Sequence, residues 1–362
     1  MQAALDIYFD EIRDKRPEFD AAITTWRERL APELERMEAE RKAIISRAIK
    51  RTATLAAIAF GALILIAIAT RGAFLFPFSI MLAVAAVTIG SAAVWVPVFA
   101  MKSQTKSLVV GAACEAFGFR YETLHPDMSG VSSWRTLGNW IRSRPSMRDA
   151  FTGFADTAEP PTPAFDRLKG ASLLPSYDSR KFEDMIEGRR ADADFTLVEC
   201  KLTEQQGSGK NRRTVTKFQG ILFNIDYPDR FLGRTLLARD GWWSWGRTGD
   251  MDKVALVSKE LEDAFTVYST DQVEARTLLT PDRMERLIAL ERHFSGGKLR
   301  GVFEDGHVTL ALEADDQFEA GSVFKPLVDP DRFIRTLTEI GLVCDLIDGF
   351  LTRDWYKDKL GY

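Results

Sequence analysis

The chain is poor in the residues that most metal sites and many catalytic sites require. It has 362 residues but only three histidines and three cysteines. They are His125, His293, His307, Cys114, Cys200 and Cys344. The histidines share no metal-binding spacing and the cysteines form no CxxC pair. We therefore expect free thiols, no metal site and no cofactor.

The motifs of common enzyme classes are absent as well. No HExxH zinc motif, GxSxG nucleophile elbow or GxxxxGK[ST] phosphate loop occurs. Gly207-Ser-Gly-Lys210 lacks the spacing of a phosphate loop and is typical of a hairpin tip. Acidic pairs such as Asp315-Asp316 are common on surfaces. The sequence gives no positive support for an enzyme, and an enzyme with an unrecognised site is kept as a third hypothesis.

Charge is almost missing from residues 52–101, where Arg71 is the one charged residue in 50 positions. Thr52–Thr70 gives 19 uncharged residues, which at about 1.5 Å per residue cover the roughly 30 Å hydrocarbon core of a bilayer. A second uncharged run follows, with a helix expected over about 78–100 after Pro77. The block predicts a transmembrane helical hairpin and excludes a purely soluble protein.

The charges that flank the hairpin predict its orientation. Seven basic residues lie on its two outer sides, and the connecting loop carries Arg71 alone. The seven are Arg41, Lys42, Arg47, Lys50, Arg51, Lys102 and Lys106. The positive-inside rule then places both termini in the cytoplasm. Gly61, Gly90 and Ser91 offer small surfaces for helix contact, but no GxxxG pair is present.

The remaining chain divides into three predicted parts. Residues 1–51 form a helical segment with an apolar stripe and no net charge, in which Pro32 is expected to kink or divide the helix. The stripe is Phe19, Ile23, Trp26, Leu30, Leu34, Met37, Ile44 and Ala48. Residues 102–175 are expected to hold a juxtamembrane helix to Gly118, a short helix near 133–142 and a proline-rich linker.

Residues 176–362 are predicted to form an α+β domain with an antiparallel sheet. Strands are expected at 193–202, 214–223, 234–238, 254–257, 265–268, 299–303 and 307–312. The last two form a hairpin over Asp305-Gly306, a pair suited to positive φ. Thr280 with Pro281, and Asp329 with Pro330, mark the starts of two helices.

Several segments resemble a known family. They are Phe182-Glu-Asp-Met-Ile-Glu-Gly188, Phe218-Gln-Gly220, Phe231-Leu-Gly-Arg-Thr235 and Phe265-Thr-Val-Tyr-Ser-Thr-Asp271, followed by Glu274-Ala-Arg276 and Leu279-Thr-Pro281. With the hairpin, they resemble an uncharacterised family of bacterial two-span membrane proteins, sometimes labelled galanin-like. The resemblance implies a bacterial inner-membrane protein with a cytoplasmic C-terminal domain, and it brings no catalytic residues.

Two clusters suggest contact with an anionic lipid surface. Basic residues lie in or beside one turn and tryptophans in another: Lys210, Arg212, Arg213, Lys217, Trp242, Trp243 and Trp245. Tryptophans lodge at headgroup depth and cations attract anionic lipids. The alternative is that the rings pack into the sheet and the basic turn is simply solvated. A net charge of -4 and a short basic turn argue against a nucleic-acid partner.

These observations leave three hypotheses in order of preference. The first is a membrane-anchored interaction or scaffold module whose partners are the bilayer and another protein or a second copy. The second is an anionic-lipid-binding or lipid-sensing module that uses the basic turn and the tryptophans. The third is an enzyme whose site the sequence does not reveal.

Overall fold

The computed structural model divides into two compact units, which are described separately. One unit comprises Met1–Ala112, Pro126–Gly153 and Ala320–Phe333, and the other comprises Ala113–His125, Phe154–Glu319 and Ile334–Tyr362. The residues that the structure describes are 16–70, 75–124, 160–207, 212–227, 230–239, 249–257, 259–294, 298–315, 318, 322 and 324–351.

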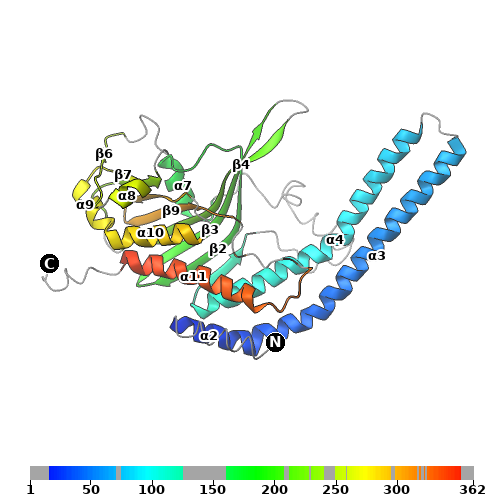
Figure 1. Cartoon of the computed structure of the whole chain (residues 1–362), viewed down its shortest axis with the longest axis horizontal. Coiled ribbons are helices and arrows are strands. Elements are labelled where there is room, and N and C mark those ends of the chain that lie inside the picture. Colours follow the sequence, from blue (N-terminus) through cyan, green and yellow to red (C-terminus); the bar gives the residue numbers. More distant parts are fainter. Residues whose placement is uncertain are drawn as a thin grey trace. The chain divides into compact units, whose positions relative to one another are not determined.

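Long helices make up the first unit (Figure 1). They are α2 (Pro17–Thr25), the π-helical turn η1 (Trp26–Leu30), α3 (Ala31–Thr70) and α4 (Leu75–Ala116), which continues into the second unit. Pro32 lies in the first turn of α3, directly after the π-helical turn. Because proline has no N–H and its ring crowds the preceding turn, the wider π-helical turn accommodates it while the helix continues.

The apolar stripe expected near the N-terminus is largely buried. Six of its eight positions are buried, namely Phe19, Ile23, Trp26, Leu30, Leu34 and Ala48, and the other two, Met37 and Ile44, are half-buried. The Trp26 ring lies 5.2 Å from the ring of Phe333. On the same unit, the Glu38 carboxylate accepts hydrogen bonds from Arg41 and, at 3.0 Å, from the backbone N–H of Leu327.

Helices α3 and α4 run antiparallel to each other as a hairpin (Figure 1). Their exposed large side chains include many apolar ones, such as Ile58, Phe60 and Ile89. Both are long and apolar enough to cross a membrane, and their most apolar stretches have no buried residues. Side chains such as Leu65 and Leu82 are exposed over 69% and 62% of their surface. Near one end of the apolar stretches, the Trp95 indole N–H donates to the Thr52 hydroxyl at 3.2 Å.

Alanines, more than glycines, lie where the two helices face each other. An apolar gap of about 260 Å³ between them is lined by Leu55, Ile58, Ala59, Ala62, Leu63, Ile66, Ser79, Leu82, Ala83, Ala86 and Val87. A Cβ at Gly90 would lie 3.1 Å from Leu55 Cδ1, so Gly90 does permit a close contact. A Cβ at Gly61 would meet nothing within 4 Å, and the role expected for Gly61 in helix contact is therefore not supported.

The second unit is an α+β fold around an antiparallel sheet, which confirms the expected fold class for this part. Nine strands pair in the order β1-β2-β3-β4-β9-β8-β5-β7-β6. The strands are β1 (Arg120–Thr123), β2 (Ser179–Arg190), β3 (Ala193–Gln206), β4 (Arg213–Asp226), β5 (Thr235–Arg239), β6 (Asp252–Lys253), β7 (Phe265–Ser269), β8 (Arg300–Glu304) and β9 (His307–Glu313). Asp305 and Gly306 have φ values of 52° and 74°, as expected for the hairpin turn between β8 and β9.

Helices cover both faces of the sheet. The helices of this unit are α7 (Pro163–Gly170), α8 (Lys259–Ala264), α9 (Gln272–Leu278), α10 (Pro281–His293) and most of α11 (Pro330–Leu351). Val302 packs in the cluster under α7, whereas the ring of its neighbour Phe303 lies 5.8 Å from that of Phe350 on α11. Because side chains alternate along a strand, α7 and α11 cover opposite faces.

The sheet unit includes two segments that we expected to be linker. Strand β1 pairs with β2, and α7 packs against the sheet through Phe165 and Leu168. The prolines at 160–163 were expected to form a stiff connector, but Thr162 caps α7 and Pro163 occupies its first turn. The strand expected at 254–257 is also displaced, since the paired residues are Asp252 and Lys253. The helix expected near 133–142 lies outside the described residues.

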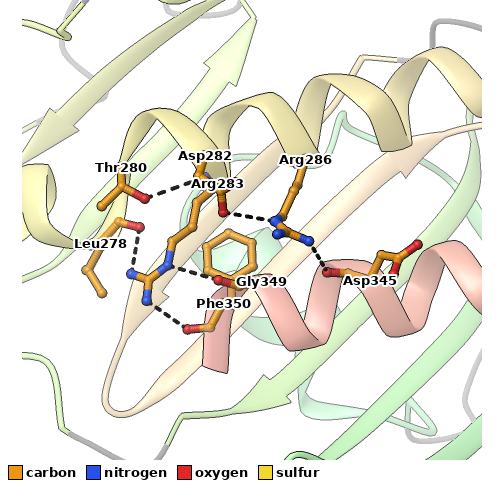
Figure 2. Close-up of polar contacts among 8 residues, drawn as sticks. All are labelled: Leu278, Thr280, Asp282, Arg283, Arg286, Asp345, Gly349 and Phe350. Carbon is orange, nitrogen blue, oxygen red and sulfur yellow. Dashed lines mark hydrogen bonds and ion pairs between the residues drawn. The ribbon is translucent and has the colours of Figure 1, made fainter. Parts of the chain in front are cut away.

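A buried arginine fastens α10 to the ends of α9 and α11 (Figure 2). The Arg283 guanidinium donates to the carbonyls of Gly349 and Phe350 at 3.2 and 3.0 Å, and to those of Thr277 and Leu278 at 3.1 Å each. These carbonyls lie at helix ends, where no backbone N–H is available within the helix. The cation therefore satisfies acceptors that would otherwise be buried without partners.

Replacing this arginine should weaken the second unit strongly. We expect Arg283→Met to lower the free energy of unfolding by about 3 kcal/mol, because four buried carbonyls lose charged donors. Arg286→Met is the matched control, since exposed Arg286 bonds Asp282 and one carbonyl, and it should cost less than about 1 kcal/mol. Thermal unfolding of the full chain in detergent measures both. Equal losses would refute the role of Arg283.

Candidate functional site

The long hairpin of β3 and β4 extends beyond the rest of the sheet (Figure 1). Its outer part, Thr203–Gln206 with Arg213–Lys217, is called the arm here. Its two strands pair with each other up to Gln206↔Arg213, whereas β2 begins at Ser179 opposite Thr203. On the other side, β9 pairs with β4 only from Gly220 onward. The arm therefore presents strand edges that its neighbours in the sheet do not cover.

Three of the seven expected lipid-contact residues lie in or beside this arm. Arg212 and Arg213 are exposed at the start of β4. Lys217 is half-buried and pairs with Glu204, its Nζ lying 3.2 Å from a carboxylate oxygen. Lys210, Trp242, Trp243 and Trp245 lie outside the described residues. Contact with lipid thus stays a prediction for all seven residues.

A cavity of about 400 Å³ opens at the base of the arm. It is lined on the β4 side by Thr216, Lys217, Phe218 and Gln219, and elsewhere by Phe294, Glu313, Ala314 and Asp315. It therefore lies where β9 ends and β4 continues without it. We call this cavity and the adjoining edge of β4 the arm groove. It combines polar walls with aromatic ones, as small-molecule and peptide sites often do.

One wall of the arm groove is held by a buried arginine that sequence reasoning missed. Arg300 forms an ion pair with Glu313, donates to the Leu173 carbonyl at 3.0 Å and lies 5.4 Å from the centre of the Phe218 ring. Burial lowers the pKa of Arg300 to about 10, which still leaves the guanidinium charged at neutral pH. The register places Arg300 opposite Ala311, so Glu313 is its diagonal neighbour. The register of the predicted hairpin could therefore have indicated that Arg300 and Glu313 are close together.

Beyond β9 the chain turns toward α11. Phe318 is buried and its backbone N–H bonds the Glu339 carboxylate of α11. Burial raises the pKa of Glu339 to about 7, an effect that the Phe318 N–H and the charge of Arg335 only partly oppose. Asp315 lines the arm groove and Phe318 lies against α11, so the segment after β9 does not continue along the edge of β4.

Two of the family-like segments, Phe231–Thr235 and Phe265–Asp271, meet Glu274 in one hydrogen-bonded network away from the arm. The Glu274 carboxylate accepts the N–H groups of Leu232 and Gly233 at 2.6 and 2.8 Å, and the Thr270 hydroxyl accepts the N–H of Arg234 at 2.9 Å. Asp271 accepts the N–H of Glu274 at 3.0 Å and so caps α9. These residues join the start of β5 to the end of β7, and their contacts serve the fold.

A second polar group lies inside the sheet unit. The Tyr121 hydroxyl donates to the Asp184 carboxylate at 2.7 Å. Burial, with the nearby charges of Asp184 and Glu199, raises the pKa of Tyr121 far above its ordinary value.

Burial likewise raises the pKa of the Cys114 and Cys200 thiols. All three cysteines are buried and free, as expected, and the thiols of Cys114 and Cys200 are protonated at neutral pH.

The buried carboxyl of Glu339 should make stability depend on pH. Its pKa is about 7 in the folded chain against an ordinary 4.5, so folding disfavours the charged form. Stability is unaffected below pH 4.5, falls as pH rises from 4.5 to 7, and is lower by about 3 kcal/mol at most above pH 7. Glu339→Gln should therefore raise the unfolding temperature at pH 8 and leave it nearly unchanged at pH 4.5. An equal change at both pH values would contradict this account.

Comparison with known proteins bears on the C-terminal part of the chain. Residues 216–351 match the family model described as "Protein of unknown function (DUF3137)". The match runs from β4 to the end of α11 and supports the resemblance for that part, but it supports neither the galanin-like label nor a two-span membrane family. No curated protein sequence matches the chain.

Among solved structures, the chain is similar to the mycobacterial trehalose monomycolate transport factor A, TtfA. The two share 12% sequence identity with a TM-score of 0.29, and the alignment covers 68% of this chain and 97% of that chain. A likeness of this size carries no argument about function. The family match therefore relates residues 216–351, from within β4 to the end of α11, to a domain family of unknown function.

Proposed function

We propose that the chain is an integral protein of the bacterial inner membrane, anchored by the α3–α4 hairpin, whose cytoplasmic α+β module binds another protein. The observation that carries the membrane part is the apolar surface of the hairpin. Phe60, Ile68 and Ile89 are exposed over 67%, 70% and 63% of their surface. Each large apolar side chain gains roughly 1.5–3 kcal/mol on leaving water, so lipid is the favourable surrounding.

The orientation is supported by charge. Arg47, Lys50 and Arg51 precede the apolar part of α3, and Lys102 and Lys106 follow that of α4. The loop between the spans carries a single positive charge, Arg71. The positive-inside rule then favours a cytoplasmic location for both outer ends, and so for the sheet unit.

The interaction role is supported by the arm groove. Strand edges with exposed backbone groups are ready sites for another chain, and natural proteins usually cover or shorten them. Here the edge of β4 extends past the end of its neighbour β9 and adjoins a cavity of about 400 Å³. A surface of this kind is better suited to binding a chain than to enclosing a reaction.

Reporter fusions test the membrane part. A green fluorescent protein fused after Tyr362 should fluoresce, whereas alkaline phosphatase at the same place should be inactive, because that enzyme matures only in the periplasm. The matched control places the phosphatase between Arg71 and Gly72, where it should be active. Active phosphatase after Tyr362 would overturn the orientation, and extraction of the chain by alkaline carbonate would overturn membrane insertion.

Mass measurement tests the interaction part. Native mass spectrometry of the full chain, extracted from its own cells in mild detergent, should show complexes heavier than the 40.7 kDa chain. A variant with charge reversal on the arm, Arg212→Glu with Arg213→Glu, should shift these complexes toward the bare chain. Recovery of the wild-type chain only as a bare monomer would contradict the proposed interaction.

Exposed Arg212 and Arg213 also favour the second candidate function, binding of anionic lipid by the arm. The expected gain is about 1 kcal/mol per cation near an anionic surface. A fluorophore on Thr214→Cys of the full chain in nanodiscs should then be quenched by lipid-borne quenchers in anionic but not in zwitterionic lipid, and less at high salt. Quenching that is indifferent to lipid charge would refute this candidate.

A further inference from the structure

We infer that the edge of β4 from Arg213 to Gln219 binds an extended, acidic segment of a partner polypeptide, which adds to the sheet as a further strand. The inference rests on the proposed function, because it names where and how the module binds another protein. Three observations on the described residues carry it: an edge that no strand pairs with, a cavity beside that edge, and two exposed arginines without an ion pair.

The edge is uncovered because of how β4 pairs on its two sides. On one side β4 pairs with β3 from Gln206↔Arg213 to Phe195↔Ile225, with a register shift at Lys217, which has no partner position on β3. On the other side β9 pairs from Gly220 to Asp226, with one further bond from the Ala314 N–H to the Gln219 carbonyl at 3.0 Å. In the described part of the chain, no strand pairs with this side of β4 before Gln219. Its outward N–H and C=O groups are open to another chain.

The chain itself leaves this edge for a physical reason. Strands β4 and β9 approach so closely at Gly220 that a Cβ there would lie 2.0 Å from the Leu312 carbonyl oxygen. Past this contact, Glu313 is fixed by buried Arg300, and Phe318 is fixed at α11 through Glu339. The residues after β9 are therefore held away from the part of β4 before Gln219.

A cavity lies beside the edge, where an added strand would place its side chains. The cavity of about 400 Å³ is lined by four consecutive residues of β4, Thr216 to Gln219, and by Phe294 and Glu313–Asp315 across from them. Seven residues from Arg213 to Gln219 span about 20 Å at roughly 3.3 Å per residue. That length fits the five to seven residues of an ordinary strand, with alternate side chains entering the cavity.

Charge determines which segment fits. Arg212 and Arg213 are exposed, and neither has an ion pair among the described residues. In antiparallel pairing of a second copy over the same seven residues, Arg213 would lie opposite Gln219, which offers it no carboxylate, and a basic segment would be repelled. Because Lys217 is paired with Glu204, carboxylates on an incoming strand would find their partners in Arg212 and Arg213 at the outer end of the edge. The complementary occupant is therefore an acidic extended segment of another protein.

Peptide selection on the full chain tests this inference. The detergent-solubilised protein is panned against a display library of random ten-residue peptides, and the enriched peptides are synthesised. We expect them to combine aspartate or glutamate with β-branched residues, and to bind at least about tenfold more weakly to the Arg212→Glu, Arg213→Glu variant. Thr216→Pro, which blocks strand pairing at the edge, should weaken them similarly.

The matched control is Lys253→Glu, a charge reversal of an exposed residue on β6, the last strand at one end of the sheet and five positions from β4, which should leave binding unchanged. If Thr216→Pro does not fold, the Arg212→Glu, Arg213→Glu variant still tests the inference, because both positions are exposed and the substitutions should leave folding intact. Absence of enrichment, enriched peptides without acidic residues, or equal binding to the double variant would overturn the inference. A wild-type dimer that the double variant converts to a monomer would assign the edge to a second copy instead.

The outcomes also separate this site from the proposed function. Membrane insertion with heavier native complexes, but no selected acidic peptide, would refute the edge site alone. Selected acidic peptides together with a chain that carbonate extracts from membranes would refute the membrane anchor and leave the edge site in place.

Discussion

The ladder between β4 and β9 is the constraint on which the sheet unit depends. Strand β4 joins the strands before it in the sequence to those that follow, because it pairs with β3 on one side and with β9 on the other. Gly220 allows the closest approach in this ladder, where any side chain would displace the backbone of β9. The paired residues of this ladder end at Gly220, and beyond the one further bond from Ala314 to Gln219 the edge of β4 is free of β9.

Much of this fold could be predicted because its signals are local. The turn at Asp305-Gly306 specifies a hairpin register, and Thr280 with Pro281 specifies the start of α10. What escaped prediction depends on distant contacts. Strand β1 has four residues with no distinctive pattern and is defined only by pairing with β2, more than fifty residues later. The prolines before α7 are compatible both with a connector and with a helix start, and only packing of Phe165 against the sheet distinguishes them.

The candidate site shows the same limit. Its basic residues were evident in the sequence, and the structure places Arg213 and Lys217 on one strand. Its other wall was not evident, because Phe294 and Glu313 come from different elements and meet only in the folded sheet. The helical hairpin shows a different limit. Composition predicts two apolar helices, but it does not predict which of their many small residues face the other helix, and only the structure identifies the alanines that do.

Arginine has two distinct uses in this unit, and burial separates them. Arg283 and Arg300 are buried, and each is surrounded by carbonyls, a carboxylate or an aromatic ring that offset the loss of water. Such a buried guanidinium already contacts groups of its own protein and is not accessible to a ligand. Arg212 and Arg213 are exposed and have no such partners among the described residues, so a carboxylate can approach them with little loss of hydration. The free energy available for recognition therefore lies at the exposed edge of β4, while buried Arg300 holds Glu313 beside that edge.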